Sequence, residues 1–471
     1  MKALRPDQIE DLANLMTHDR WALLNDPGTG KTPTVCVYMQ WLWSEFGEKT
    51  IWVMPKSLIG KNRQELLEWS EFSPDEVIHY EGGKTPSNVK VFLMTFTRFG
   101  ASWRDLLKQH PEINTLVADE IHLGFKGDSS NRTQELYKAM KRIKRFVPMT
   151  GTLIAGRLST CYPTIHVIEP RYYTSLSNFN QIHQVVNPFS GRVEGWQNHE
   201  RLNIILNEHS SRRTFTSVFG VNEPVIQTEL VPMAELQRET YDKFEKDACL
   251  ELEQIILDGS LPGVATIRCR QIMQHPECVK LPVGTDEMGK PILQPFNLLS
   301  KHEITGKDDR LIIHLVDHLN SGKPLVIFSV FQREQERLVE LACKVGLRVG
   351  LINGNVVGTK RTAMDEAFRA GNLDVLVCSP TTAGVGFNWQ DIGQHELDHM
   401  IFVSVDYTDD RFTQAYKRAI RRKRLSALRV TVLEYENSVD QRIFQIANDY
   451  SRHAKLVDPT REALDLGVKS V

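Results

Sequence analysis

Short runs of apolar and β-branched residues alternate along the chain with amphipathic stretches of helical length. In the first half the apolar runs predict strands at residues 21–24, 51–54, 91–94, 115–118 and 146–149. In the second half they predict strands at 325–328, 349–352, 375–378, 400–403 and 430–433. Strands that alternate with helices are typical of parallel sheets with crossover helices. The pattern therefore predicts an α/β protein with two doubly wound lobes.

The alternation breaks between the two halves, where proline and glycine interrupt helical segments such as residues 232–247. A polar, proline-rich stretch follows at residues 282–295. We interpret this region as a mainly helical insertion with a linker. The expected division is residues 1–160 for the first lobe, 161–300 for the insertion and linker, and 301–471 for the second lobe.

A glycine-rich segment follows the first predicted strand and opens a predicted helix, with the sequence DPGTGKT at residues 26–32. Gly28 and Gly30 allow the backbone to curl so that its N–H groups face phosphates, and the helix N-terminus favours negative charge. Lys31 is expected to reach the β and γ phosphates of a nucleotide, and the Thr32 hydroxyl to complete the shell of a Mg²⁺ ion. The segment predicts a phosphate-binding loop.

A second candidate lies about 90 residues further on, where an apolar strand ends in two adjacent carboxylates within VADEIH at residues 117–122. We expect Asp119 to hold the metal ion, directly or through water, and Glu120 to polarise the attacking water. Acid pairs at strand ends are usually only solvated, so the catalytic interpretation depends on the phosphate loop that precedes them.

A basic segment in the second half, QAYKRAIRRKR at residues 414–424, supplies the third candidate. On one helix, Gln414, Arg418 and Arg421 fall on the same face. We expect the two arginines to act on the γ phosphate, which places hydrolysis between the two lobes. A solvated basic helix, a nuclear-import segment and a contact to a nucleic-acid backbone are the alternatives.

The composition adds limits rather than a function. The net charge is −2, with 41% hydrophobic and 25% charged residues, as in a soluble globular enzyme. Seven cysteines without a CxxC pair do not form a disulfide framework, and a reducing, cytoplasmic compartment fits best. The spacing of Cys269, His275 and Cys278 matches no common zinc pattern. No apolar run is long enough to span a bilayer, so no membrane partner is expected.

Together these segments resemble superfamily 2 helicases and translocases with a DEAD/DEAH-box-type core, and their spacing resembles the SWI/SNF-like branch. The resemblance extends over nearly the whole chain and implies two RecA-like lobes, ATP and Mg²⁺ as cofactors, and a compact motor without appended modules. Two stretches look specific to that branch, SRR at residues 211–213 and RQIMQHP at residues 270–276.

The resemblance also implies roles for individual residues. Binding of the nucleotide is assigned to Arg5, Gln8, Gly28, Thr29, Gly30, Lys31, Thr32, Gly386 and Gln414. Coupling of hydrolysis to movement is assigned to Thr150, Gly151 and Thr152. Contacts to nucleic acid are assigned to Lys56, Ser57, Thr95, Ser329, Asn353 and Thr381.

The chain departs from the usual patterns at four positions. Asn25 stands where the general phosphate loop has its first glycine, and Leu153 stands where the family usually has proline. Lys417 and Lys423 stand where glycine is usual. These differences bear on fine tuning and leave the expectation of ATP hydrolysis in place.

The expected function is an ATP-dependent DNA helicase or translocase that moves on duplex or branched DNA, with little sequence preference, and remodels or unwinds it. DNA replication, recombination or repair is the expected setting, at the nucleoid if the host is bacterial or viral. An RNA helicase and an ATP-gated, protein-displacing clamp without strand separation are the alternatives. The sequence names no protein partner.

Overall fold

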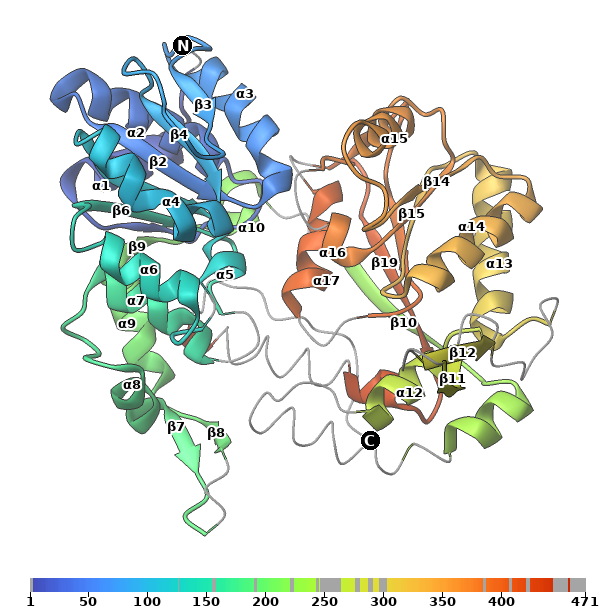
Figure 1. Ribbon diagram of the computed structural model, residues 1–471. Helices are drawn as coiled ribbons and strands as arrows, with labels where there is room; N and C mark the ends of the chain where they lie inside the picture. The colour runs from blue at the N-terminus through green and yellow to red at the C-terminus, as the bar shows by residue number, and fades with distance from the viewer. Residues whose placement is uncertain are drawn as a thin grey trace. The chain divides into compact units, whose positions relative to one another are not determined.

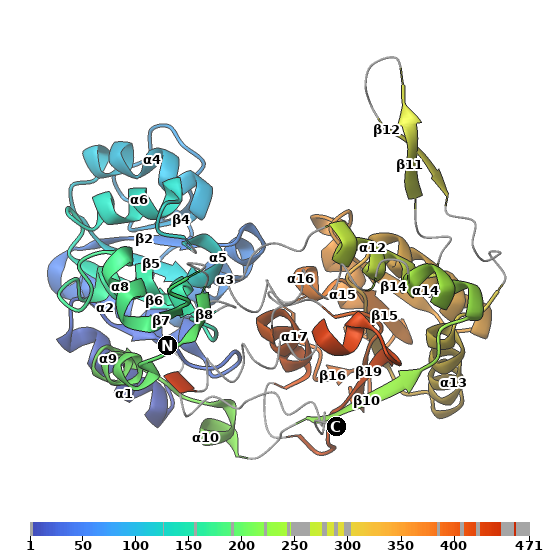
Figure 2. The same cartoon turned by 90° about the horizontal axis from the view of Figure 1, so that it is seen from below.

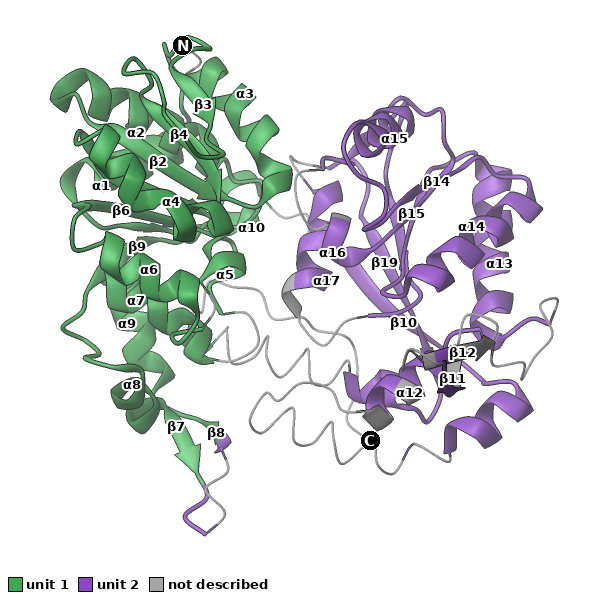
Figure 3. Cartoon of the chain, viewed as in Figure 1, with its two compact units in different colours: residues 1–186, 195–221, 452–462 green, residues 187–194, 222–451, 463–471 purple. Residues whose placement is uncertain are grey.

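The chain forms two compact units, each built around its own parallel sheet (Figure 3). The first unit comprises residues 1–186, 195–221 and 452–462, and the second comprises residues 187–194, 222–451 and 463–471. The computed structural model describes residues 3–125, 127–154, 158–189, 193–220, 224–242, 245, 264–275, 280–286, 291–295, 303–383, 387–405, 409–420, 424–443 and 456–457. The predicted fold class is confirmed.

The sheet of the first unit has the strand order β3-β4-β2-β5-β6-β1-β9, and all of its pairs are parallel. Figure 1 labels β2, β3, β4, β6 and β9 of this sheet. All six residues of the interior strand β2 are buried, as expected where helices cover both faces of a parallel sheet. The strands are β1 (Ala22–Leu23), β2 (Lys49–Met54), β3 (Val77–His79), β4 (Val91–Thr95), β5 (Ile113–Asp119), β6 (Arg145–Met149) and β9 (Ser210–Ser211).

Helices cover both faces of this sheet: α1 and α2 lie on one side, and α4 and α6 lie on the other (Figure 2). The Thr95 and Ser130 hydroxyls accept hydrogen bonds from backbone N–H groups in the first turns of α4 and α6. These N–H groups have no partner within the helix itself. The helices are α1 (Pro6–Thr17), α2 (Lys31–Phe46), η1 (Lys56–Leu58), α3 (Ile59–Trp69), α4 (Phe96–Gln109), α5 (Ile121–Gly124), α6 (Asn131–Ala139), η2 (Leu158–Cys161), α7 (Tyr162–Ile168), α8 (Leu176–His183), α9 (His199–His209) and α10 (Phe215–Phe219). A short hairpin of β7 (Gln184–Val186) and β8 (Val193–Trp196) lies between α8 and α9.

The sheet of the second unit has the order β10-β19-β18-β13-β15-β14, again with parallel pairs only. Its strands are β10 (Val225–Val231), β13 (Leu325–Phe328), β14 (Val349–Ile352), β15 (Val375–Cys378), β18 (His399–Phe402) and β19 (Arg429–Tyr435). Its helices are α12 (Val264–Ile272), α13 (Gly306–Ser321), α14 (Gln332–Val345), α15 (Thr359–Arg369), α16 (Pro380–Ala383), α17 (Asp409–Tyr416) and η4 (Lys417–Ala419). A two-stranded ribbon of β16 (Asp391–Ile392) and β17 (His395–Glu396) completes the unit.

The region between residues 161 and 300 contains more strand than its sequence predicts. The proline-rich stretch expected to be a linker forms an antiparallel hairpin of β11 (Lys280–Thr285) and β12 (Pro291–Pro295), which extends from the second unit (Figure 2). The same region supplies β9 to the first sheet and β10 to the second. The boundaries expected at residues 160 and 300 stay a prediction.

Three histidines pack together where α13 meets the sheet of the second unit: His314 and His318 of α13 and His399 of β18. His399 Nδ1 lies 2.9 Å from His318 Nε2 and 3.1 Å from the Arg429 guanidinium, and its Nε2 lies 2.9 Å from the Thr431 hydroxyl. The rings of His314 and His399 meet at a centroid distance of 5.3 Å. Burial, with Arg429 and the neighbouring imidazoles, lowers the pKa of His399 to about 2.

This histidine makes the second unit sensitive to acid. Below the ordinary histidine pKa of about 6.5, His399 is protonated in the unfolded chain but stays neutral in the native protein. The free energy of unfolding therefore falls by up to about 1.4 kcal/mol for each pH unit below that pKa. We expect His399→Gln to lose less stability between pH 7.5 and pH 5.5 than the wild type, measured by urea unfolding. The control His395→Gln changes an exposed imidazole and should keep the wild-type dependence. Equal pH dependence in all three proteins would refute the prediction.

Gly124, the last residue of α5, is packed against the Phe96 ring. A Cβ atom added there would lie 2.1 Å from Phe96 Cδ1, whereas a Cβ at Gly60 in α3 meets nothing within 4 Å. Because Phe96 is buried, we expect Gly124→Ala to lower the free energy of unfolding by about 1–3 kcal/mol. Gly60→Ala should be neutral or stabilising by up to about 1 kcal/mol. Chemical denaturation of both variants tests the difference, and equal effects would contradict it.

Candidate nucleotide-binding site

The carboxyl ends of β1, β5 and β6 meet at one edge of the first sheet. Met149 at the end of β6 pairs with both Leu23 of β1 and Asp119 of β5. Loops that follow neighbouring parallel strands emerge at the same edge, which is where open α/β sheets bind ligands. The phosphate loop, the acidic pair and the Thr150–Thr152 segment are therefore brought together, as their positions after predicted strands indicate.

The glycine-rich loop has the backbone that its sequence predicts. Gly28 and Gly30 have φ angles of 87° and 88°, a region that favours glycine. A Cβ atom at Gly30 would also lie only 2.4 Å from Gln8 Nε2. Helix α2 begins at Lys31, whose ammonium donates to the carbonyl oxygens of Asn25 at 2.6 Å and Asp26 at 3.2 Å. The loop thus presents a helix N-terminus and a cation at the sheet edge.

The start of α1 is bound to this loop. Gln8 Nε2 donates to the Gly30 carbonyl at 2.9 Å, and the Arg5 guanidinium donates to the Thr29 carbonyl. The Arg5 guanidinium also lies 5.0 Å from the centre of the Phe219 ring of α10, a cation–π contact. Arg5 and Gln8, both assigned to the nucleotide by the resemblance, therefore contact the phosphate loop.

Asp119 ends β5 as a buried carboxylate, 6% exposed. Burial and the neighbouring Glu120 raise its pKa to about 6, while a 2.8 Å hydrogen bond from Asn62 and the charge of Lys31 favour the ionised form. A divalent cation would offset the cost of this buried charge, and hard oxygen ligands are those that Mg²⁺ prefers. The donor set of Asp119 and the half-buried Thr32 therefore fits a magnesium ion. Nothing in the sequence pattern points to Asn62.

Glu120 differs from its neighbour in backbone and in partners. Its φ of 49° places a residue other than glycine in the left-handed region, which costs of order 1–2 kcal/mol and is found where surrounding contacts enforce it. Its Oε2 accepts from the Thr150 hydroxyl at 3.4 Å, and His122 Nδ1 lies 2.8 Å from the same hydroxyl. The two adjacent carboxylates thus point into different surroundings.

The Thr150–Thr152 segment packs against the phosphate loop. The Thr150 N–H donates to the Leu23 carbonyl at 3.1 Å. A Cβ atom at Gly151 would lie 2.5 Å from Cδ of Pro27, so only glycine allows this approach. This segment is therefore in contact with both the phosphate loop and Glu120, and its coupling role stays a prediction.

The residues expected to contact nucleic acid differ in exposure. In the first unit Lys56 and Ser57 are exposed on η1, and Thr95 is half-buried at the start of α4. In the second unit Thr381 is exposed on α16.

Ser329 and Asn353 are both buried, and their contact to nucleic acid stays a prediction. Ser329 is fully buried, and its hydroxyl bonds to Glu334 and to Ser404 at 3.2 Å. Asn353 is 3% exposed, and its amide oxygen accepts from the Asn355 N–H at 3.0 Å. In this conformation their polar atoms fix the ends of β13 and β14.

The basic segment of the second unit is not one continuous helix. Helix α17 ends at Tyr416, a single 3-10 turn follows at Lys417–Ala419, and Ile420 is extended. Gln414 and Arg418 are both buried, at 5% exposure each. The lysines and arginines of this segment have no acidic residue three or four positions away, so no ion pair along a helix stabilises the helical conformation there. Arg421 and Gly386 lie outside the described residues.

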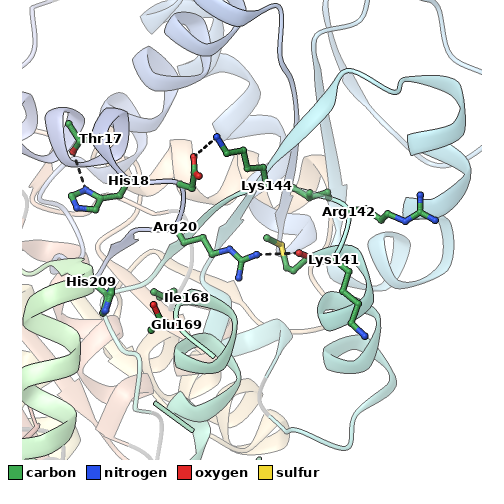
Figure 4. A pocket seen from close by; sticks show the side chains of 12 residues that line it. Thr17, His18, Arg20, Lys141, Arg142, Lys144, Ile168, Glu169 and His209 are labelled. Carbon is green, nitrogen blue, oxygen red and sulfur yellow. Dashed lines mark hydrogen bonds and ion pairs between the residues drawn. The ribbon is translucent and has the colours of Figure 1, made fainter. Parts of the chain in front are cut away.

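A cavity of about 630 Å³ is lined by residues that precede β1 and β6, at the opposite edge of the first sheet, and by Ile168, Glu169 and His209 (Figure 4). Two of its cations have partners: Lys144 lies 3.1 Å from Asp19, and Arg20 donates to the carbonyls of Met140 and Val167 at 3.3 and 2.5 Å. This cavity is separate from the nucleotide-binding edge.

No helix among the described residues is long and apolar enough to cross a membrane.

His275 Nε2 lies 2.9 Å from the Glu303 carbonyl oxygen, and Cys278 lies outside the described residues.

Comparison with known proteins gives two family matches. The model of the SNF2-related domain matches residues 12–278, and that of the helicase conserved C-terminal domain matches residues 307–423. The chain is 22% identical over 451 residues to the CHD3-type chromatin-remodeling factor CHR7 of Arabidopsis thaliana, covering 91% of this chain and 35% of that protein. It is 30% identical over 124 residues to the ATP-dependent RNA helicase DBP3 of Cryptococcus neoformans, covering 24% and 20%. The chain thus spans about a third or less of the length of these curated relatives.

Among solved structures, the helicase domain of Hef from Pyrococcus furiosus matches with a TM-score of 0.53 and 13% identity, over 94% of this chain and 97% of that one. This likeness supports two RecA-like lobes. The SNF2-related match covers more than half of the chain, and family membership implies ATP hydrolysis. The chain therefore belongs to the SNF2-related family of superfamily 2 helicases.

Proposed function

We propose that the chain is an ATP-driven translocase that moves on duplex or branched DNA and remodels or unwinds it. The observation that carries the proposal is the meeting of the phosphate loop, Asp119–Glu120 and Thr150–Thr152 at one sheet edge. Phosphoryl transfer needs little from a protein beyond positioning and charge stabilisation, and this edge holds groups for both.

In this proposal each group at the edge has its own task. The N–H groups of the loop and Lys31 bind the β and γ phosphates, since both are presented at the start of α2. A Mg²⁺ ion held by Thr32 and Asp119 would neutralise charge on the same phosphates. Glu120 orients the attacking water and accepts its proton.

The coupling step follows from the hydrogen bond between Thr150 and Glu120. When the γ phosphate leaves, a movement of the Glu120 carboxylate changes its hydrogen bond with the Thr150 hydroxyl. His122 Nδ1 also contacts this hydroxyl, at 2.8 Å. Thr150–Thr152 then transmits the change, because Gly151 packs on Pro27 of the loop. The roles of Arg418 and Arg421 on the γ phosphate, and of Gln414 and Gly386 at the nucleotide, remain predictions.

DNA is favoured over RNA because the relative aligned over 91% of the chain is a chromatin-remodeling factor, whereas the RNA helicase aligns over 24%. Steady-state ATPase rates test which nucleic acid the protein acts on. The rates are compared at one fixed salt concentration without nucleic acid and with single-stranded DNA, linear duplex DNA, forked DNA or RNA. Greatest stimulation by duplex or forked DNA supports the proposal. Stimulation by RNA alone favours the RNA helicase, and none by any polymer favours a partner-dependent clamp.

Lys31→Ala should lower ATP turnover by about a hundredfold or more, because one preorganised cation at the phosphates is lost. The Lys108→Ala variant removes an exposed cation of α4 and should keep the wild-type rate. Steady-state hydrolysis and thermal melting of both variants test this. Near-normal turnover of a folded Lys31→Ala protein would mean that the phosphates bind elsewhere.

Glu120→Gln should bind ATP but hydrolyse it about 10²- to 10⁴-fold more slowly, the range for loss of a general base. The amide keeps the size of the side chain and an oxygen that accepts from Thr150. Single-turnover hydrolysis and equilibrium nucleotide binding separate the two effects, with Glu112→Gln as the half-exposed control. A loss of less than about threefold would remove Glu120 from the catalytic step.

A further inference from the structure

The adjacent arginines Arg212 and Arg213 belong to a stretch that looks specific to the SWI/SNF-like branch, and ATP hydrolysis as proposed above uses neither. They follow β9 and point to different partners. Arg212 bonds to the side chain of Asn203 in α9 at 2.8 Å. Arg213 bonds to two acids of α1, Asp11 at 3.0 Å and Glu10 at 2.8 Å. Arg213 therefore contacts α1, the helix whose start is bound to the phosphate loop, whereas Arg212 contacts α9.

Asp11 connects Arg213 to the phosphate loop. Its carboxylate is 2% exposed, and while one oxygen accepts from Arg213, the other accepts from Asn25 Nδ2 at 2.6 Å. Asn25 is equally buried, and among the described residues its Oδ1 has no hydrogen-bond partner. Asp11 thus anchors the Asn25 side chain, and Arg213 compensates the charge of Asp11.

Asn25 in turn holds the lysine of the loop. Its backbone carbonyl accepts from Lys31 Nζ at 2.6 Å, so the orientation of the Asn25 peptide affects where the ammonium lies. The next residue is fixed by the same segment, because the Asp26 N–H donates to the Arg213 carbonyl at 2.8 Å and Asp26 Oδ2 accepts from the Phe215 N–H at 3.0 Å. The segment at residues 213–215 therefore braces the first turn of the phosphate loop through side chain and backbone.

The identity of residue 25 explains why this brace exists. The general phosphate loop has glycine at this position, which offers no side chain to hold. An amide can donate to the Asp11 carboxylate, whereas a carboxylate at residue 25 would only accept and would repel Asp11. A buried aspartate that loses its cationic partner is strongly destabilised, so Asp11 keeps its place only while Arg213 is present.

We propose that Arg213 and Asp11 are positioning residues that fix the phosphate loop, and with it Lys31, by holding the side chain of Asn25. The proposal rests on Lys31 binding the nucleotide. It gives the second arginine of the pair a task that the first does not share. It also makes the departure from glycine at residue 25 part of a brace that ties the loop to α1 and to the segment after β9.

The first test measures the affinity of a fluorescent ATP analogue together with KM and kcat for ATP. Arg213→Ala should weaken analogue binding and raise KM by about tenfold, with kcat lowered by less than about threefold, because the loop is displaced while Glu120 is untouched. Arg212→Ala is the matched control and should keep wild-type binding. If melting shows that Arg213→Ala is unfolded, Arg213→Gln replaces it, since glutamine keeps a donor without the charge.

The second test asks whether Arg213 acts through Asn25. In Asn25→Gly, which restores the general loop pattern, adding Arg213→Ala should raise KM by less than about twofold, because the side chain that the brace holds is gone. The same tenfold effect in both backgrounds would show that Arg213 serves only the local fold and would overturn the proposal. Analogue binding separates this outcome from failure of the proposed function: a chain that binds the analogue without hydrolysing ATP still tests the brace.

Discussion

The structure of the nucleotide-binding edge depends on the parallel pairing of β6 with both β1 and β5. That pairing places Leu23, Asp119 and Met149 in register, so the three loops that follow them begin side by side. The Thr150 N–H then closes on the Leu23 carbonyl at 3.1 Å, and Gly151 packs on Pro27. Without this register the phosphate loop and the acidic pair would still be present, but they would not share a site.

Two adjacent carboxylates at one strand end repel each other when both are ionised. In this fold Asp119 and Glu120 lie in different surroundings. Asp119 continues the strand into a buried position, where burial raises its pKa to about 6 and Asn62 supplies a donor. Glu120 turns into the left-handed region and faces the Thr150 hydroxyl. In the proposed reaction a cation would stabilise Asp119, whereas Glu120 already accepts from a hydroxyl, so the two carboxylates would have different tasks.

The sequence predicts the strands of both sheets closely where apolar runs are buried on both faces, as at Leu325–Phe328, which has the predicted bounds. It does not predict β9 or β10, because Ser210–Ser211 is polar and too short for a pattern, and β10 is a half-exposed edge strand. It also misplaces the end of α17, since periodicity alone carries the helix through a run of cations. The phosphate loop and the acidic pair are predictable because local chemistry defines them.

What local sequence cannot reveal is which distant side chains hold these motifs in place. Asn62 lies 57 positions before Asp119, and Arg213 lies 202 positions after Asp11. Arginine and asparagine at such positions are ordinary surface residues until the fold buries their partners. Once buried, a carboxylate needs a donor or a cation at a defined place, so the fold restricts which side chains can stand at residues 62 and 213. The nucleotide-binding edge is therefore larger than its motifs, and its outer members are set by the cost of burying Asp11 and Asp119.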